Sequence, residues 1–260
     1  MSNESLATKY RPQTWNDVVE QGSTKIILQN QLKTNTVKHA YLFVGGAGTG
    51  KTTCARIFAN EINNNIGEPI ELDAASNSSV DDVRELIHQS KTQSLESEYK
   101  VFIIDECHSL SDKAWQAFLK ILEEPPAKSV FIFCTTNPEK IPLTIISRVQ
   151  RFTFKRISQD GIVHRLEYIA DNEPKKVCER WDDSALDYLA KLSDGGMRDA
   201  ITLMDKCLSY SNDLTLDVVM QAVGGVDYDA MIDLTTFLII GDAGAVIESI
   251  EKIHLSGIDL

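Results

Sequence analysis

Long hydrophobic runs are missing from this chain of 260 residues. The longest apolar stretches, such as Val101-Phe102-Ile103-Ile104, hold four or five residues, whereas a membrane-spanning helix needs about 20. The first ten residues carry no basic segment followed by an apolar one, so the sequence predicts no secretory signal. We therefore expect a cytoplasmic protein with no membrane segment.

Paired cysteines are also missing. The five cysteines are an odd number, and none forms a Cys-x-x-Cys pair: Cys54, Cys107, Cys134, Cys178 and Cys207. This pattern argues against a disulfide framework and against a zinc site formed by neighbouring residues. Cys107 and Cys134 lie in apolar stretches, where a buried free thiol is the usual finding. We therefore expect no zinc and assign no function to a cysteine.

Positive charge is scarce in only one part of the chain. The formal net charge is -12, but residues 1–157 hold 18 Lys and Arg against 18 Asp and Glu, whereas residues 158–260 hold 8 against 20. The excess negative charge is therefore C-terminal, and the step near residue 157 indicates a domain boundary. The N-terminal part remains able to meet a phosphate backbone.

Short apolar runs alternate with segments of helical period over residues 1–157, which is typical of a parallel α/β sheet. Several runs are too uniformly apolar to be half exposed, as expected of central strands that are covered on both faces. The predicted strands are Tyr41–Val44, Ile70–Leu72, Val101–Ile104, Val130–Cys134 and Arg151–Phe154. The predicted helices begin near Lys51, Val80, Ser111 and Ile141.

Helical periodicity runs through the chain after residue 157. Gly195-Gly196 ends one helix, and a turn at 223–225 precedes two more, near 228–240 and 243–254. The sequence therefore predicts three parts. They are an α/β domain at 1–157, a small helical domain at 158–224 and the beginning of a further helical domain at 225–260.

The strongest motif is a glycine-rich loop of the form G-x-x-x-x-G-K-T, placed between a predicted strand and a predicted helix. Glycines let backbone amides surround a triphosphate, and the start of the helix adds partial positive charge. We expect Lys51 to reach the outer phosphates and Thr52 to bind Mg²⁺. The alternative is a glycine-rich turn with an unrelated lysine, and the flanking elements argue against it. The expected nucleotide-binding residues of this loop are Gly45, Gly46, Ala47, Gly48, Thr49, Gly50, Lys51, Thr52 and Thr53.

Two carboxylates, Asp105 and Glu106, follow the predicted strand at 101–104. Ligands of open parallel sheets bind at the edge where the strands end. We expect Asp105 to hold Mg²⁺ through its water shell, and Glu106 to orient and deprotonate the attacking water. The alternative is an acidic strand end that only caps the next helix, and the phosphate loop argues against that reading.

Asp105-Glu106-Cys107-His108 also spells the DExH box of superfamily-two helicases. Such helicases need a second motor domain, and only the acidic, helical residues 158–260 remain for one. We therefore interpret His108 as a residue that leads into the next helix or packs against it.

Three further polar positions fit the surroundings of a bound nucleotide, although a single arginine is usually only solvated surface. Thr135-Thr136-Asn137 ends a predicted strand, Ser147-Arg148 follows the segment 142–147, and Arg198 begins a helix after Met197. Together they fit a polar group beside the γ-phosphate, an arginine at an edge and an arginine on a mobile lid.

Eight segments carry a family resemblance. They are Lys9-Tyr10-Arg11-Pro12, the phosphate loop, Asp73-Ala74-Ala75-Ser76-Asn77, Ile104-Asp105-Glu106, Leu122-Glu123-Glu124-Pro125-Pro126, Thr135-Thr136, Ser147-Arg148 and Arg198-Asp199-Ala200. With them the chain resembles the AAA+ clamp-loader ATPases, above all the gamma/tau family of bacterial DNA polymerase III, from about residue 6 to the end. The resemblance implies an AAA+ P-loop NTPase domain with a parallel five-stranded sheet, a small helical lid domain and the start of a helical collar domain.

The resemblance also assigns roles around ATP and Mg²⁺. It makes Thr136 the γ-phosphate sensor, Arg198 a lid arginine acting in cis, and Arg148 an arginine acting on the ATP of a neighbouring subunit. With Lys51 and Glu106, Thr136 and Arg148 complete the expected catalytic set. The resemblance places Tyr10, Arg11, Pro12, Val18 and Val19 at the adenine, and Arg84 and Lys113 at the DNA backbone.

For the whole protein, the resemblance implies an ATPase subunit of a heteropentameric loader. Such a loader opens a ring-shaped sliding clamp and places it on primer-template DNA. Its subunits are held together chiefly by their collar domains, and only two collar helices are expected here. We therefore expect this chain by itself to be monomeric.

The sequence departs from the family in three places. The family's four-cysteine zinc module is missing, since only residues 60–69 fill its position, which is consistent with a phage-encoded or otherwise streamlined relative. Val149 replaces the cysteine that usually follows the Ser-Arg motif. Asn77, Ser78 and Ser79 stand where the family offers basic residues to DNA, and Arg84 is kept.

Two other functions remain to be weighed against a clamp loader. A ring motor that acts on branched DNA or on proteins would need aromatic pore loops, and none is recognisable. A nucleotide-binding scaffold subunit that no longer hydrolyses ATP would not need Lys51, Thr52, Asp105 and Glu106 to be intact.

Overall fold

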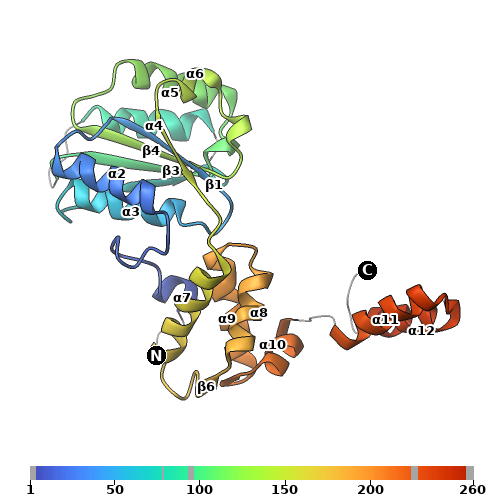
Figure 1. Cartoon of the computed structure of the whole chain (residues 1–260). Coiled ribbons are helices and arrows are strands. Elements are labelled where there is room, and N and C mark those ends of the chain that lie inside the picture. The colour runs from blue at the N-terminus through green and yellow to red at the C-terminus, as the bar shows by residue number, and fades with distance from the viewer. Residues whose placement is uncertain (1–3, 78, 93–96, 224–227, 256–260) are drawn as a thin grey trace. The chain divides into compact units, whose positions relative to one another are not determined.

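The computed structural model describes residues 4–77, 79–92, 97–223 and 228–255, which divide into two compact units (Figure 1). The α/β unit contains residues 11–157, and the helical unit contains the residues from 158 onward together with those before Arg11. The division after Ile157 coincides with the step in charge. Residues 4–10, which belong to the domain predicted at 1–157, group with the helical unit.

The α/β unit is built on a parallel sheet of five strands in the order β2-β3-β4-β1-β5. The strands are β1 (Ala40–Gly45), β2 (Ile70–Asp73), β3 (Lys100–Asp105), β4 (Ser129–Thr135) and β5 (Gln150–Phe154). All five predicted strands are confirmed, and each extends at most one residue beyond its predicted ends. Because all the strands run the same way, the residues that follow β1, β3 and β4 meet at one edge of the sheet.

Helices cover both faces of this sheet (Figure 1). One face carries α2 (Gly22–Lys33) and α3 (Lys51–Ile62), and the other carries α4 (Val80–Ser90), α5 (Asp112–Glu123) and α6 (Leu143–Ile146). Successive strand residues point to opposite faces. On β3, for example, Phe102 and Ile104 join the core under α4 and α5, while Val101 and Ile103 join the core under α3. This burial on both sides explains why the central strands β1, β3 and β4 are almost entirely apolar, whereas the outer strands β2 and β5 alternate exposed residues with more buried ones.

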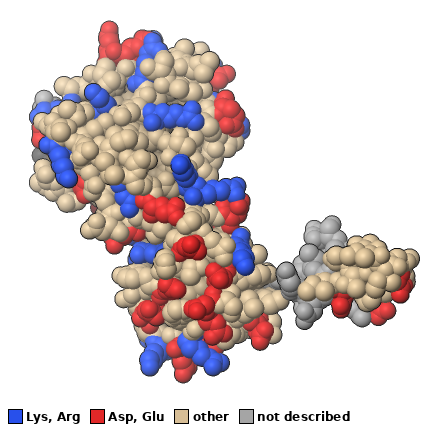
Figure 2. Space-filling model, in the orientation of Figure 1, with Lys and Arg blue, Asp and Glu red and all other residues tan. Residues whose placement is uncertain are grey.

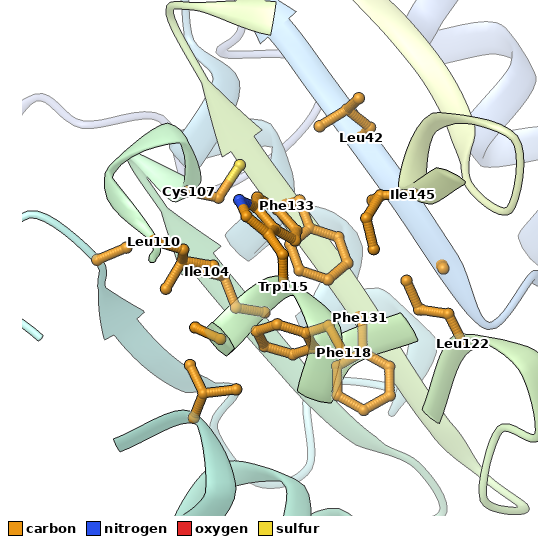
Figure 3. Close-up of a cluster of buried hydrophobic side chains, with 14 of the residues drawn as sticks. Leu42, Ile104, Cys107, Leu110, Trp115, Phe118, Leu122, Phe131, Phe133 and Ile145 are labelled. Carbon is orange, nitrogen blue, oxygen red and sulfur yellow. The ribbon is translucent and has the colours of Figure 1, made fainter. Parts of the chain in front are cut away.

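Aromatic rings fill the core between α5 and the sheet (Figure 3). The ring centroid of Phe133 on β4 lies 5.6 Å from that of Trp115 and 5.1 Å from that of Phe118, both on α5. Phe118 also meets Phe131 on β4 with the centroids 6.2 Å apart. This packing holds α5 against β4, and the carboxyl end of β4 leads into the candidate site.

Polar residues define where the helices of this unit begin. Ser79 and Asp82 form a capping box, and α4 begins at Val80 as predicted. The Ser111 hydroxyl accepts a hydrogen bond from the Ala114 N–H at 3.3 Å, so Ser111 is the cap of α5 rather than its first residue. Helix α6 begins at Leu143, two residues later than predicted, because Pro142 precedes it.

The helical unit contains α1 (Leu6–Lys9), α7 (Gln159–Asn172), α8 (Asp183–Leu192), α9 (Met197–Tyr210), α10 (Leu216–Val223), α11 (Tyr228–Ile240) and α12 (Ala243–Leu255). Two short strands, β6 (Arg180–Trp181) and β7 (Asp213–Leu214), pair in parallel, so the prediction of helices throughout is incomplete. Acidic side chains gather on the face of this unit seen in Figure 2. Among the described helices of both units, none is long and apolar enough to cross a membrane.

The two helices predicted near 228–240 and 243–254 are confirmed as α11 and α12, which pack against each other. Gly241 lies between them with φ of 80°, a left-handed conformation that glycine adopts readily. Ile239 and Ile247 are among the isoleucines that this hairpin exposes. Of the turn predicted at 223–225, Val223 is the last residue of α10, and residues 224–225 lie outside the described residues, as do residues 256–260.

Several contacts tie residues 4–10 to the other helices of their unit. The Leu6 N–H donates to the Asp205 carboxylate at 3.1 Å, and the Lys9 ammonium bonds the buried Glu173 carboxylate. The Arg165 guanidinium donates to the Tyr10 carbonyl at 2.9 Å. These contacts explain why the N-terminal segment belongs with α7 and α9, which lie more than 140 residues further along the chain.

Candidate nucleotide-binding site

The phosphate loop connects β1 to α3 and depends on two glycines with different requirements. A Cβ atom at Gly45 would lie 2.5 Å from the Phe154 carbonyl oxygen, so no larger residue fits there without displacing β5. Gly50 has φ of 95°, which L side chains rarely adopt, and it immediately precedes the first turn of α3. The loop therefore owes its shape to close backbone packing at one end and to a left-handed residue at the other.

Lys51 is folded back onto the loop. Its side chain is buried, and its ammonium donates to the carbonyl oxygens of Gly45 at 3.0 Å and Gly46 at 2.8 Å. Burial lowers the pKa of the ammonium, whereas the nearby Glu106 and Asp105 carboxylates act in the opposite direction. Phosphate oxygens are stronger acceptors for an ammonium than neutral carbonyls, so this lysine is suited to exchange the carbonyls for a bound phosphate.

Thr52 and Asp105 come together although they lie 53 residues apart. The Thr52 hydroxyl donates to one oxygen of the Asp105 carboxylate at 2.7 Å, and the other oxygen accepts from the Glu106 N–H at 3.0 Å. Hydroxyl and carboxylate oxygens are the ligands that Mg²⁺ prefers, so this pair fits the predicted metal site. Thr53 is partly buried one residue further along α3, and Thr49 is buried with its hydroxyl bonded to the Gly46 carbonyl.

Glu106 and Thr136 also meet at this edge of the sheet. Glu106 has φ of 45°, an uncommon left-handed value for a residue with a side chain, and it begins the turn after β3. Its Oε2 atom accepts a hydrogen bond from the Thr136 hydroxyl at 3.3 Å. The expected base and the expected γ-phosphate sensor are therefore in direct contact.

His108 contacts Glu106, which sequence reasoning did not predict. The residue does belong to a short helical turn, Cys107–Ser109, that leads toward α5, as expected. Its Nδ1 atom also lies 3.3 Å from Glu106 Oε2 and 3.2 Å from the Thr135 hydroxyl oxygen. The position of a histidine two residues after the glutamate was the only available signal.

Arg148 lies at the opposite edge of the sheet. It follows α6 and comes two residues before β5 begins, whereas Lys51, Asp105 and Thr136 are at the ends of β1, β3 and β4. Its guanidinium donates to the Glu123 carboxylate at 2.8 Å and to the Thr144 carbonyl at 2.7 Å. The structure therefore does not bring Arg148 together with the phosphate loop of the same chain.

The residues expected at the adenine belong to different units. Tyr10 is in the helical unit, as is Arg198, the second residue of α9. The other four, Arg11, Pro12, Val18 and Val19, are in the α/β unit. Val18 is buried in the same core cluster as Trp15, Val19 is partly buried, and Arg11 and Pro12 are partly exposed.

Arg84 and Lys113, the residues expected at the DNA backbone, line one groove between α4 and α5. The groove has a volume of about 1170 Å³, and its other basic lining residues are His88, Lys91 and Lys120. Glu124 is the single acidic residue among those that line it. The structure therefore brings the two predicted residues together in a groove whose charged residues are mostly basic.

Comparison with protein families identifies this combination of domains. The family described as DNA polymerase III, delta subunit, matches residues 20–69 and 68–158. The family described as DNA polymerase III clamp loader subunit, ATPase lid domain, matches residues 161–213.

The chain is similar to curated proteins over most of its own length. It is 44% identical over 235 residues to DNA polymerase III subunit tau of Bacillus subtilis, which covers 82% of this chain and 41% of that protein. It is 34% identical over 281 residues to DNA polymerase III subunit tau of Escherichia coli, covering 100% of this chain and 43% of that protein. The chain thus spans about two fifths of the length of these relatives.

Among solved structures, the Holliday junction branch migration motor RuvB of Thermotoga maritima aligns with a TM-score of 0.66. The alignment has 19% sequence identity and covers 90% of this chain and 80% of that chain. At this identity the likeness shows the AAA+ P-loop fold alone. The two family matches and the identity to DNA polymerase III tau subunits over most of the chain show that the chain belongs to the clamp-loader ATPase family of DNA polymerase III.

Proposed function

We propose that this chain binds and hydrolyses ATP as a subunit of a sliding-clamp loader, which opens the clamp and places it on primer-template DNA. One observation carries the proposal. A buried lysine, a hydroxyl–carboxylate pair suited to Mg²⁺ and a glutamate in contact with a threonine all lie at the carboxyl edge of a single parallel sheet.

In this proposal the residues of the site share the work of hydrolysis. Lys51 exchanges the loop carbonyls for phosphate oxygens, and the first amides of α3 bind the phosphates from the other side. Thr52 and Asp105 would hold Mg²⁺, which would supply positive charge to neutralise the phosphates. Glu106 accepts a proton from water as the water oxygen attacks the γ-phosphorus. The bond to the β–γ bridging oxygen breaks, so ADP and phosphate are the products.

The remaining predicted residues act outside this centre. Arg198 on the lid acts on the nucleotide in cis, and Tyr10, Arg11, Pro12, Val18 and Val19 bind the adenine. Arg148 serves the ATP of a neighbouring subunit, since it lies far from its own phosphate loop. The basic groove with Arg84 and Lys113 follows the phosphate backbone of primer-template DNA, because phosphate contacts rely on Lys and Arg. The family's partners are then other loader subunits and the clamp.

Single-turnover ATP hydrolysis by the assembled loader tests the proposal. Lys51→Ala should abolish nucleotide binding, because the lysine contacts phosphate charge that is already present in bound ATP. Glu106→Gln should bind ATP normally and lose hydrolysis, because the glutamate is needed only in the transition state. Two exposed residues provide matched controls, and Lys33→Ala and Glu139→Gln should leave both properties unchanged. Wild-type turnover by Glu106→Gln would reject the base, and the absence of ATP hydrolysis by the wild-type loader would support a scaffold role instead.

A further inference from the structure

His108 makes a contact that the proposed mechanism does not use. Its Nδ1 atom lies 3.3 Å from Glu106 Oε2, and its side chain is only 17% exposed compared with 38% for Glu106. The imidazole is therefore held by the protein, and it touches the one carboxylate to which we assign proton transfer.

The distance of 3.3 Å between His108 Nδ1 and Glu106 Oε2 is that of an ion pair, and the hydrogen bond that Nδ1 makes in this structure is with the Thr135 hydroxyl. An ionised carboxylate only accepts, so the contact requires a proton on Nδ1 of His108. Thr135, the other partner of Nδ1 at 3.2 Å, is buried, and its hydroxyl oxygen already accepts from the Asn137 N–H at 3.0 Å. Thr135 thus positions the imidazole, and the Nδ1 atom of His108 also faces Glu106 Oε2.

Thr136 and His108 approach the same oxygen of Glu106. The Thr136 hydroxyl and His108 Nδ1 each approach Oε2, and among the described residues none bonds to Oε1. A carboxylate held at one oxygen presents the other to solvent. This is the arrangement that a general base needs in order to take a proton from water.

A threonine hydroxyl has a single proton to donate. If Thr136 senses the γ-phosphate, as the family resemblance implies, its proton must go to the phosphate and can no longer hold Glu106. His108 then remains as the donor to the carboxylate. The backbone of Glu106 does not hold its carboxylate in place. The Glu106 N–H donates to Asp105, and the Ser109 N–H donates to the Glu106 carbonyl, so these bonds fix the main chain and not the side chain.

We infer that His108 is a positioning residue for hydrolysis: its Nδ1–H keeps the Glu106 carboxylate in place after Thr136 turns to the γ-phosphate. The inference rests on the proposed role of Glu106. In this inference His108, the histidine of the DExH sequence, takes part in ATP hydrolysis in a chain that is not a helicase.

Three variants of His108 in the assembled loader, with clamp and primer-template DNA present, test the inference. His108→Ala should lower kcat for ATP hydrolysis by about 10- to 100-fold, since a misplaced reacting group costs about that much, and should leave the Kd of ATP within about twofold. His108→Asn should recover most of the loss, because its amide nitrogen is bonded to Cγ as Nδ1 is. His108→Gln carries its amide one bond further out and should recover little.

The outcomes separate positioning from packing. Unchanged kcat in His108→Ala, equal recovery by Asn and Gln, or a loss of ATP affinity that accounts for the fall in rate would each overturn the inference. Thermal melting identifies variants that fail to fold, and if His108→Ala is one of them, the comparison of Asn with Gln decides.

Glu106→Gln, measured in parallel, distinguishes this inference from the proposed function. An inactive Glu106→Gln beside a fully active His108→Ala would reject the role of His108 alone. A fully active Glu106→Gln would reject the base and the inference together.

Discussion

Replacing Arg148 gives the sharpest test of how this subunit works with its neighbours. The guanidinium lies before β5, and the phosphate loop lies after β1 at the other edge of the sheet. Strands β4 and β5 hold seven and five residues. At about 3.3 Å per residue, the two edges are therefore roughly 16 to 23 Å apart.

This separation sets the size of any effect on the ATP of the same chain. A unit charge about 16 Å away in water contributes about 0.3 kcal/mol, which is less than a twofold change in rate. An arginine that touches the transferring phosphoryl group contributes a factor on the order of 10³, or about 4 kcal/mol. We therefore expect Arg148→Ala to lower turnover of the assembled loader by about 10³ while ATP affinity is unchanged.

The ion pair with Glu123 does not prevent this role. The two side chains are 34% and 52% exposed, and an exposed pair of this kind contributes about 0 to 1 kcal/mol. Glu123→Gln, which removes the partner and keeps Arg148, should accordingly change turnover by less than about fivefold. It is the matched control for loss of the ion pair alone.

A mixed assembly decides whether Arg148 acts in trans. Loaders that combine Arg148→Ala chains with Lys51→Ala chains contain interfaces in which an intact phosphate loop faces an intact arginine. ATP hydrolysis should reappear in such assemblies although neither variant is active alone. A confirmed mixed assembly without recovered hydrolysis would refute the reasoning.

Four further outcomes are expected. Gly45→Ala should lower the free energy of unfolding by about 1 to 3 kcal/mol in urea titrations because its Cβ meets the Phe154 carbonyl, whereas Gly46→Ala, whose nearest neighbour is 3.7 Å away, should change it little. Burial raises the pKa of the Cys54 thiol to about 12, whereas the thiol of the unfolded chain ionises near pH 8.5. The contribution of the neutral thiol to the free energy of unfolding is therefore complete below about pH 8.5 and is lost as the pH rises toward 12. Wild-type stability should therefore fall between pH 7 and 10 by up to about 2 kcal/mol more than that of Cys54→Ala, and equal pH dependence would contradict this. Elemental analysis should find no stoichiometric zinc. By light scattering this chain alone should be monomeric at micromolar concentration and, in the same samples, a poor ATPase; a stable ring would contradict the expectation.

The central strands of the sheet were predictable because they are buried on both faces. Runs such as Val101–Ile104 and Val130–Cys134 have no polar alternation, and the structure places their side chains in two separate cores. Helix α2 was not predicted because its apolar residues do not form one stripe. Leu28 is buried, while Ile26 and Ile27 are 60% and 42% exposed.

Within the site, the residues at strand ends were predictable and their contacts were not. A parallel sheet brings the ends of β1, β3 and β4 to one edge, so Thr52, Asp105 and Thr136 had to be neighbours. The contact of His108 with Glu106 depends on the left-handed turn at Glu106, which no local pattern specifies. The bond of Arg148 to Glu123 depends on the packing of α5 and α6, which the sequence leaves open.

The grouping of residues 4–10 with α7 means that the polypeptide passes between its two units twice, at Tyr10–Arg11 and at Ile157–Ser158. A single covalent link would leave one unit free to turn about any axis, whereas two links permit only motions that stretch neither link. Cleavage in either link alone would also leave the units joined. Proteolysis should therefore release a separate α/β fragment only after both links have been cut.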